Sequence, residues 1–143
     1  MREQIASHET VKMVGDNFIL TNVENTGAAL NLGQDLSPNM KMIFLQILPL
    51  FILALLFVYV LKESKISRLH LVAISFIIGG GLGNIYDRIL YDSVTDFMYL
   101  EYGFLHTGIF NMADVSVVIG GVLILINPIV EAIQNIQIRK VNL

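Results

Sequence analysis

Hydrophobic residues are gathered along this chain into three long runs, and polar segments separate the runs. The first run covers residues 42–61 and is interrupted only by Gln46 and Pro49. An α-helix needs about 20 apolar residues to cross a bilayer, and it tolerates proline there, so this run predicts a transmembrane helix. The runs over residues 69–85 and 113–133 predict two more such helices.

The second run is rich in glycine, with Gly79, Gly80, Gly81 and Gly83. Gly79 and Gly83 have the small-xxx-small spacing that lets membrane helices approach closely, so we expect helix packing at this pair. A dinucleotide-binding G-x-G-x-x-G pattern is not completed, because Asn84 stands where its last glycine would be. Near the end of the third run, Pro128 predicts a kink or an interfacial turn.

The two polar segments, residues 1–41 and 86–112, predict short strands and turns. Phe18 to Val23 is strand-like, and turn-forming residues follow it at Asn25, Gly27, Asn31 and Gly33. Extended pieces in the later segment are indicated by Val94, Phe97, Tyr99, Tyr102 and Phe104. The predicted fold class is a mainly α-helical membrane protein. One membrane-embedded domain covers residues 1–143, with three transmembrane helices and a small extracytoplasmic β-cradle.

Composition supports this class and excludes others. Hydrophobic residues make up 55% of the chain and charged residues 15%, against about 25% charged in soluble proteins. The chain has no cysteine, which excludes disulfides, thiolate nucleophiles and cysteine-bound metal centres. Its net charge of −3 and the lack of a basic block argue against nucleic-acid binding.

Basic residues predict the orientation in the membrane. They occur in the short loop after the first run and near the end of the chain, at Lys62, Lys65, Arg68, Arg139 and Lys140. Such residues are enriched on the cytoplasmic side, so residues 86–112 and 1–41 should lie outside. No apolar segment precedes residues 1–41 to carry them across the membrane. We therefore expect an upstream helix in a longer form of this protein.

Two acidic residues at the outer edge of the membrane are candidates for chemistry. Carboxylates at this depth are costly and usually functional, which draws attention to Asp114 at the start of the third run. The structural alternative is that Asp114 complements the dipole at a helix N-terminus. By the predicted topology, Asp96 lies on the same side of the membrane. Two neighbouring carboxyl groups can share a proton and activate water, although spacing alone does not show that these two meet.

A further polar group stands at the end of the second run. Asn84 precedes Asp87 and Arg88 by three and four residues, so the three share a helix face. A surface Asp–Arg pair is the structural alternative. The histidines, His8, His70 and His106, have no i,i+4 pairing with each other or with glutamate, and they do not predict a zinc site.

Other functions weighed against a paired-carboxylate hydrolase are less consistent with the sequence. A serine nucleophile lacks a recognisable triad around Ser67, Ser75, Ser93 or Ser116. A non-enzymatic transporter or channel subunit would use Asp87, Asp96 and Asp114 as a proton or cation path. Such a path needs polar groups deep in the bilayer, whereas these acids gather at one edge. A catalytically inactive fragment is the third alternative.

Four short motifs occur in order along the chain with suitable gaps: Asn25-Thr26-Gly27-Ala28-Ala29, Gly83-Asn84-Ile85-Tyr86-Asp87-Arg88, Val94-Thr95-Asp96-Phe97 and Phe110-Asn111-Met112-Ala113-Asp114. Together they resemble lipoprotein signal peptidase, signal peptidase II, over nearly the whole chain. The resemblance implies a multi-pass bacterial inner-membrane protease. Its substrates are prolipoproteins, cleaved just before a diacylglyceryl-modified cysteine by two aspartates, without metal or other cofactor.

The resemblance also implies roles for individual residues and a monomeric enzyme. Asp96 and Asp114 would be catalytic. Residues that bind substrate or support the site would be Asn25, Gly27, Ala28, Asn84, Asp87, Arg88 and Asn111. The sequence departs from the family in lacking its first membrane helix, and Met1–Gln4 resembles the segment just after that helix. Leu30 stands where phenylalanine is usual, and Asp92 where glycine is common.

Overall fold

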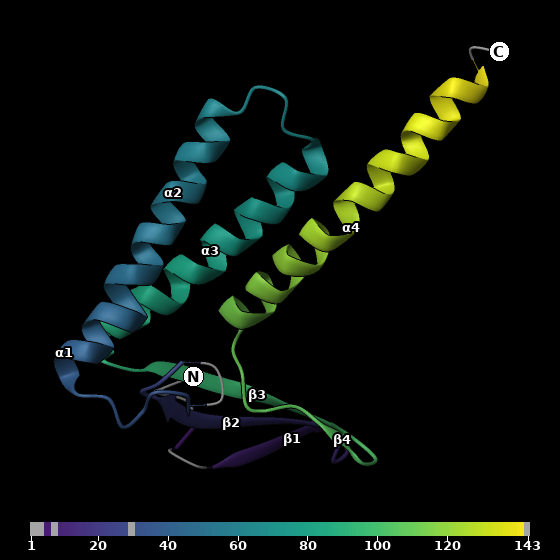
Figure 1. Ribbon diagram of the computed structural model, residues 1–143. Helices are drawn as coiled ribbons and strands as arrows, with labels where there is room; N and C mark the ends of the chain where they lie inside the picture. The colour runs from purple at the N-terminus through teal and green to yellow at the C-terminus, as the bar shows by residue number, and fades with distance from the viewer. Residues whose placement is uncertain (1–4, 7–8, 29–30, 142–143) are drawn as a thin grey trace.

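The computed structural model describes residues 5–6, 9–28 and 31–141 of the chain. Met1–Gln4, His8, Ala29 and Leu30, which entered the predictions, lie outside the described residues. The described part consists of three long helices with a small sheet lying across one end of them (Figure 1). This arrangement confirms the predicted fold class.

The first long helix runs over Pro38–Lys62 and is built from three parts, α1 (Pro38–Lys41), η2 (Met42–Ile47) and α2 (Leu48–Lys62). In η2 the backbone widens to a π-helix, and the Leu48 N–H donates to the Ile43 carbonyl. The widened turn directly precedes Pro49, which has no N–H to donate and whose ring would clash with the carbonyl four residues earlier. The proline therefore reshapes the helix without ending it.

The second long helix, α3 (Arg68–Tyr91), extends six residues beyond the predicted end at residue 85. The expectation of an extended loop from Tyr86 onward was therefore wrong for Tyr86–Tyr91. Helical hydrogen bonds continue through this polar stretch until Asp92, whose φ of 57° is left-handed and whose N–H closes the helix on the Arg88 carbonyl.

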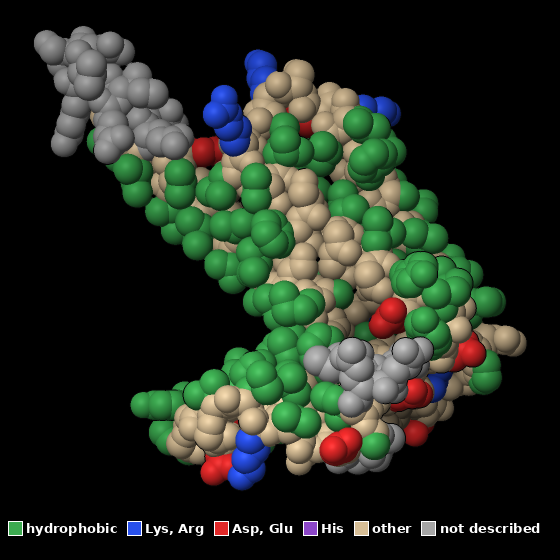
Figure 2. All heavy atoms as spheres, turned by 180° about the vertical axis from the view of Figure 1, so that it is seen from behind, with side chains coloured by type: hydrophobic (Ala, Val, Ile, Leu, Met, Phe, Trp, Pro, Cys, Tyr) green, Lys and Arg blue, Asp and Glu red, His purple; other side chains and the backbone are tan. Residues whose placement is uncertain are grey.

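The third long helix, α4 (Met112–Val141), also continues past its predicted end at residue 133. Pro128 lies inside it, and the helix does not end there, so the predicted interfacial turn is absent from this described segment. All three long helices are long and apolar enough to cross a membrane. Their exposed surfaces are covered with hydrophobic side chains, as contact with lipid requires (Figure 2).

Glycines bring α3 and α4 together, but not at the predicted pair. A Cβ atom added to Gly80 would lie 2.3 Å from the Ala113 carbonyl oxygen, and one added to Gly120 would lie 2.6 Å from a backbone oxygen of α3. A Cβ at Gly79 would meet nothing within 4 Å, and one at Gly83 would touch only a side chain at 3.3 Å. The close contact thus depends on Gly80 and Gly120, because these face the neighbouring helix.

The sheet has four antiparallel strands in the order β1 (Thr10–Val14), β2 (Phe18–Asn25), β3 (Val94–Tyr102) and β4 (Leu105–His106). The strand predicted at Phe18 to Val23 is confirmed as part of β2. Pairing of β2 with β3 joins residues about 70 or more positions apart in the sequence, with Val23 opposite Asp96 and Asn25 opposite Val94. This pairing carries the polar end of β2 to the ends of α3 and α4.

Candidate active site

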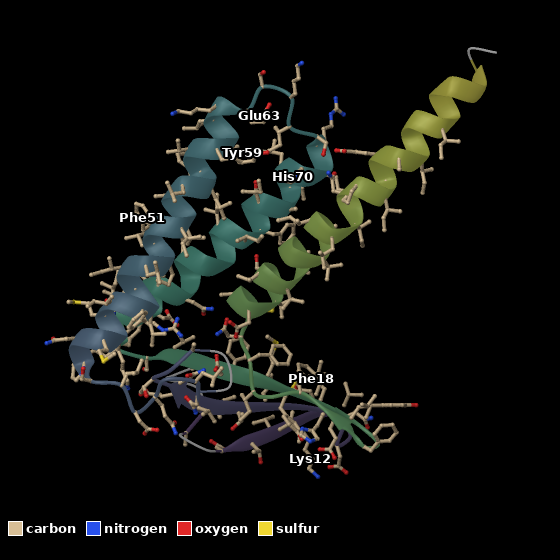
Figure 3. The ribbon with its side chains drawn as sticks, in the orientation of Figure 1. Lys12, Phe18, Phe51, Tyr59, Glu63 and His70 are labelled. Carbon is tan, nitrogen blue, oxygen red and sulfur yellow. The ribbon has the colours of Figure 1, made fainter. Side chains whose placement is uncertain are left out.

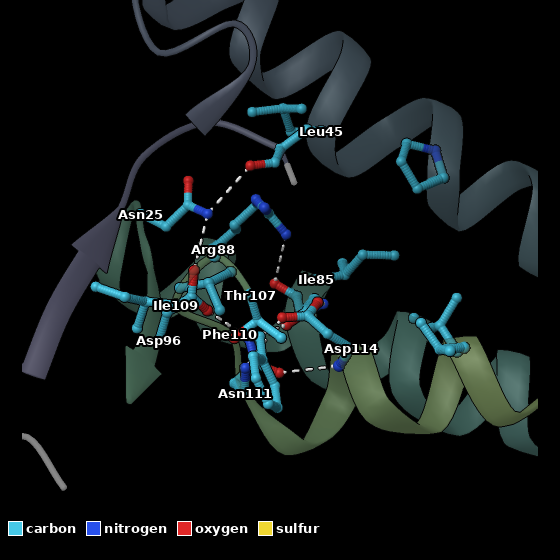
Figure 4. Close-up of a pocket in the computed structure, with 18 of the residues that line it drawn as sticks. Asn25, Leu45, Ile85, Arg88, Asp96, Thr107, Ile109, Phe110, Asn111 and Asp114 are labelled. Carbon is cyan, nitrogen blue, oxygen red and sulfur yellow. Dashed lines mark hydrogen bonds between the residues drawn. The ribbon is translucent and has the colours of Figure 1, made fainter. Parts of the chain in front are cut away.

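A cavity of about 480 Å³ lies where the sheet meets the helix ends. Its polar wall contains Asn25, Asn84, Arg88, Asp96, Asn111 and Asp114 (Figure 4). Its apolar wall is formed by residues of all three long helices, among them Phe44, Leu45, Pro49, Ile85, Val117 and Val118. Two carboxyl groups thus share one cavity with a hydrophobic surface.

Asp96 is held in β3 between two asparagine side chains. Asn25 Nδ2 donates to its Oδ2 at 2.9 Å, and Asn111 Nδ2 donates to its Oδ1 at 2.7 Å. The residue is only 4% exposed. Burial raises the pKa of the Asp96 carboxyl, and the charge of Asp114 acts in the same direction, while the two asparagine bonds and Arg88 oppose the shift. Burial has the larger effect, so the protonated form of Asp96 is favoured.

Asp114 lies in the first turn of α4, and its carboxylate is bonded on both oxygens. Asn84 Nδ2 donates to Oδ1 at 2.8 Å, and the Asn111 N–H donates to Oδ2 at 3.1 Å. In return, Asn111 Oδ1 accepts from the N–H groups of Ala113 and Asp114. This is a reciprocal capping box, with asparagine at the cap and aspartate three residues later. Asp114 therefore caps the helix N-terminus, which was the structural alternative considered from the sequence, and it also lines the cavity.

Asn111 links the two acids. Its backbone N–H binds Asp114, and its side-chain amide binds Asp96 and also Asn84 Oδ1 at 3.1 Å. Among the described residues no hydrogen bond joins the two carboxyl groups directly. Asn111 bridges them, and Asn84 binds both Asn111 and Asp114. Asn111 is 5% exposed, so these bonds lie in a site largely shielded from water.

The turn after β2 closes one side of the cavity. Asn25 Oδ1 accepts from the Gly27 N–H, and Asn25 Nδ2 donates to the Ala28 carbonyl as well as to Asp96. A Cβ atom on Gly27 would lie 2.7 Å from backbone atoms of Asn31, so no larger residue fits this fold of the turn. The predicted site residues Asn25, Gly27 and Ala28 therefore form one structural unit.

Arg88 connects this turn to α3. Its Nη2 donates to the Gly27 carbonyl at 2.6 Å and its Nη1 to the Asn84 carbonyl at 3.3 Å. Its Nε is buried and, within the described part of the chain, has no hydrogen-bond partner. Arg88 thus positions the turn against α3.

Asp87 is the predicted site residue that the structure separates from the others. It does not line the cavity, although its charge is close enough to interact with Arg88. Two residues that the sequence analysis noted only as interruptions of an apolar run, Gln46 and Pro49, lie at or beside the cavity. Pro49 lines the cavity, and Gln46 Nε2 donates to the Arg88 carbonyl at 3.4 Å. A polar residue inside a membrane run was the available signal for Gln46.

Metal ligation was not predicted from the sequence. Across the described residues, no group of three or more histidine, aspartate or glutamate side chains comes together as a metal site would require. The acids of the cavity are instead surrounded by amide donors, which are hydrogen-bond partners of carboxylates.

Comparison with known proteins identifies the family. The family model described as signal peptidase (SPase) II matches residues 1–130 of the chain. The chain belongs to the signal peptidase II family. It is accordingly an aspartic endopeptidase, and the transporter interpretation is not retained.

Relatives support this assignment of the signal peptidase II chain. It is 36% identical over 123 residues to the lipoprotein signal peptidase of Borrelia turicatae. The match covers 82% of this chain and 71% of the relative. It is 33% identical over 125 residues to that of Clostridium acetobutylicum, covering 87% and 78% of the two chains.

Solved structures agree with the fold of this signal peptidase II. One bacterial membrane enzyme superposes with a TM-score of 0.78 at 31% identity, covering 93% of this chain and 77% of that one. A second superposes with a TM-score of 0.74 at 32% identity, covering 89% and 79%. The family, the helical class and the multi-pass membrane character predicted from the sequence are thus confirmed.

Proposed function

We propose that this chain removes signal peptides from diacylglyceryl-modified prolipoproteins by hydrolysing the peptide bond just before the lipidated cysteine. Asp96 and Asp114 activate the water that attacks this bond. The observation that carries the proposal is the double attachment of Asn111, which binds both carboxyl groups in one cavity. Family membership supports the substrate class.

The hydrolysis uses the two carboxyl groups in different protonation states. Burial raises the pKa of the Asp96 carboxyl, so we assign the proton that the pair shares to Asp96. Asp114 takes a proton from water while the water oxygen bonds to the scissile carbonyl carbon, and Asp96 gives its proton to the carbonyl oxygen. When the carbon–nitrogen bond breaks, Asp114 returns its proton to the leaving amine. Asp96 regains a proton as the new carboxyl group forms, so the pair ends as it began.

The cavity wall fits a substrate that is half peptide and half lipid. Phe44, Leu45 and Pro49 offer an apolar surface from the first long helix, opposite Val117 and Val118 of α4. Acyl chains and the apolar part of a signal peptide can lie against such a surface by packing, without passing through water, because the bilayer around the helices is equally apolar. The lipid anchor therefore brings the peptide bond to the cavity without sequence recognition.

The polar side of the cavity suits the extended backbone of the substrate. Arg88 lines the cavity, and the turn at Asn25, Gly27 and Ala28 approaches closely without large side chains. We assign these residues, with Asn84 and Asn111, to substrate binding and to support of the acids. Asp87 is assigned a weaker, electrostatic influence through Arg88.

The proposed setting is the cytoplasmic (inner) membrane of a bacterium, with the site near the outer face and the C-terminus in the cytoplasm. Basic residues support this orientation, because Lys62 and Lys65 lie at the helix ends far from the cavity. The enzyme is proposed to act as a monomer.

The test is cleavage of a diacylglyceryl-modified prolipoprotein peptide by the purified chain in detergent, beside its Asp96→Asn and Asp114→Asn variants. We expect each variant to lose activity by at least ~10²–10⁴-fold, the usual effect of losing an acid or base. Asp92→Asn is the matched control, because it removes an exposed carboxylate whose left-handed backbone suits asparagine. Normal cleavage by a folded Asp96→Asn or Asp114→Asn enzyme would refute the two-aspartate mechanism.

A further inference from the structure

The sheet has one apolar face that the helices leave uncovered at its far end. Val14 lies opposite Phe18, Phe18 opposite Leu100, and Tyr102 opposite Leu105. Directly opposed side chains share a face, as do alternate residues of one strand, so these rows are continuous. We call this surface the apolar sheet end; it consists of Val14, Phe18, Leu100, Tyr102, Leu105 and the turn residue Phe104.

The other face of this end of the sheet contains its charged residues. Lys12 lies opposite Ile19, which lies opposite Tyr99, and Glu101 lies opposite His106. The Tyr99 hydroxyl donates to Glu101, and the Tyr99 ring stacks on His106 at a centroid distance of 6.5 Å. Polar and apolar side chains are therefore segregated across a sheet only one layer thick.

The apolar face is turned toward the side on which the helices lie. Figure 3 shows Phe18 on the helix side of the sheet and Lys12 on the opposite side. Figure 2 shows a hollow between the free end of the sheet and α4, with hydrophobic side chains on both walls. The exposed hydrophobic residues of α4 include Val118, Val122 and Leu125, which share one helix face. The apolar sheet end thus continues the lipid-facing surface of a membrane helix.

The most exposed hydrophobic residues of the sheet lie at its tip. Tyr102 is 79% exposed and Phe104 is 90% exposed. Gly103 between them has a φ of 62°, and Phe104 has negative φ, which makes a tight two-residue type II′ turn. The turn holds two aromatic rings at the end of a short hairpin, where aromatic residues favour the boundary between lipid and water.

We infer that the apolar sheet end rests in the lipid of the bilayer leaflet nearest the active site, with Tyr102 and Phe104 inserted at the interface. Lipid is the occupant that fits, because the surface is continuous with the membrane-spanning helices and the charged residues of this end of the sheet, Lys12 and Glu101, lie on the opposite face. The membrane then holds β3, the strand that carries Asp96, at the level of the interface. This inference concerns lipid contact alone and does not depend on the proposed reaction.

A matched pair of tryptophan variants tests it, since the chain has no tryptophan of its own. Tyr102→Trp and Tyr99→Trp are the same substitution on one strand, on its apolar and polar faces. The full chain is reconstituted in phosphatidylethanolamine–phosphatidylglycerol vesicles that contain lipids brominated on their acyl chains. We expect blue-shifted emission and strong quenching by brominated lipid for Tyr102→Trp. Tyr99→Trp should emit at longer wavelength and be quenched by iodide in the water.

Equal iodide quenching of both variants would overturn the inference, because the sheet would then stand in water. Shielding of Tyr102→Trp that disappears on dilution into excess lipid would also overturn it, since a second copy of the chain would be the cover. A second measurement does not rely on tryptophan. The chain has no cysteine, so nitroxide-labelled Phe104→Cys and Lys12→Cys can be compared. The nitroxide on Phe104→Cys should be more accessible to oxygen than to a water-soluble nickel complex, and the nitroxide on Lys12→Cys should not.

Discussion

The two ends of the helix bundle each contain a buried asparagine, but they use it differently. At the sheet end, Asn111 binds Asp96 and Asp114, which come from different elements. At the far end, Asn127 of α4 accepts from the Ser67 hydroxyl and donates to Glu131, one turn further along its own helix. Asn127 is 7% exposed, about as buried as Asn111. Burial and hydrogen bonding are thus shared, and only the convergence of two carboxyl groups distinguishes the active site.

The largest expected effect separates these two asparagines directly. Asn111→Ala removes the bonds to Asp96 and the cap of α4, so we expect cleavage to fall by roughly 10²–10⁴-fold, with a loss of about 1 kcal/mol in stability from the cap. Asn127→Ala should lower the thermal midpoint but leave kcat per folded molecule unchanged. Cleavage assays and circular dichroism melts in the same detergent measure both. If Asn127→Ala lost kcat as severely while folded, the comparison between the two ends would fail.

Arg88 gives the next effect, because it connects the turn after β2 with α3. Arg88→Lys keeps the charge but loses the planar group that reaches both Gly27 and Asn84. A charged hydrogen bond is worth about 1.5–3 kcal/mol, so kcat/KM should drop roughly 10–100-fold. Arg68→Lys, at the exposed start of the same helix, is the control and should retain full kcat/KM. An unchanged rate for Arg88→Lys would show that the turn does not depend on the guanidinium.

The seam between α3 and α4 joins the two ends, and its glycines predict a purely structural effect. Gly80→Ala places a methyl group against the Ala113 carbonyl, and overpacking of this kind costs about 1–3 kcal/mol. Gly79→Ala enters open space and should be neutral. Unfolding in mixed micelles, followed by helical circular dichroism, measures the difference. Equal stability of the two variants would contradict the close packing at Gly80.

The smallest effect is a pH dependence that only the site end should show. The raised pKa of Asp96 means that the folded protein favours the protonated form and that the unfolded chain ionises at lower pH. The stability contributed by protonated Asp96 is therefore present at acidic pH and is lost as the pH rises through the raised pKa. The asparagine of Asp96→Asn cannot ionise. The thermal midpoint of this variant, relative to that of the wild type, should therefore rise as the pH is raised from about 4 to about 8. Parallel midpoint curves would count against the shift.

Much of the fold could be predicted because membrane helices are encoded in long apolar runs. Helix ends were harder, since Asp87 and Arg88 look like loop residues although the hydrogen bonds of α3 continue through them to Tyr91. The choice of packing glycine failed for a similar reason. Spacing shows that two small residues share a face, but the rotation of one helix against its neighbour decides which of them makes contact.

Most residues that line the polar wall of the cavity could be predicted from the sequence, but the bonds between them could not. Asp96 and Asp114 stand out by position, yet only the pairing of β2 with β3 and the start of α4 bring them into one cavity. Asp87 shows the limit of reasoning from a helix face. At about 100° per residue, it lies roughly a quarter of a turn from the centre of the side of α3 that contains Asn84 and Arg88.

The reciprocal cap of α4 has a consequence for inhibitors. Because the same bonds hold Asp114 and begin the helix, the carboxylate is already fixed before any ligand arrives. A compound that bridges Asp114 and Asp96 therefore meets a preorganised pair and loses little conformational entropy on the protein side. Its affinity should depend mainly on how well it replaces the bonds from Asn84 and Asn111, and rigid polar cores should outperform flexible ones.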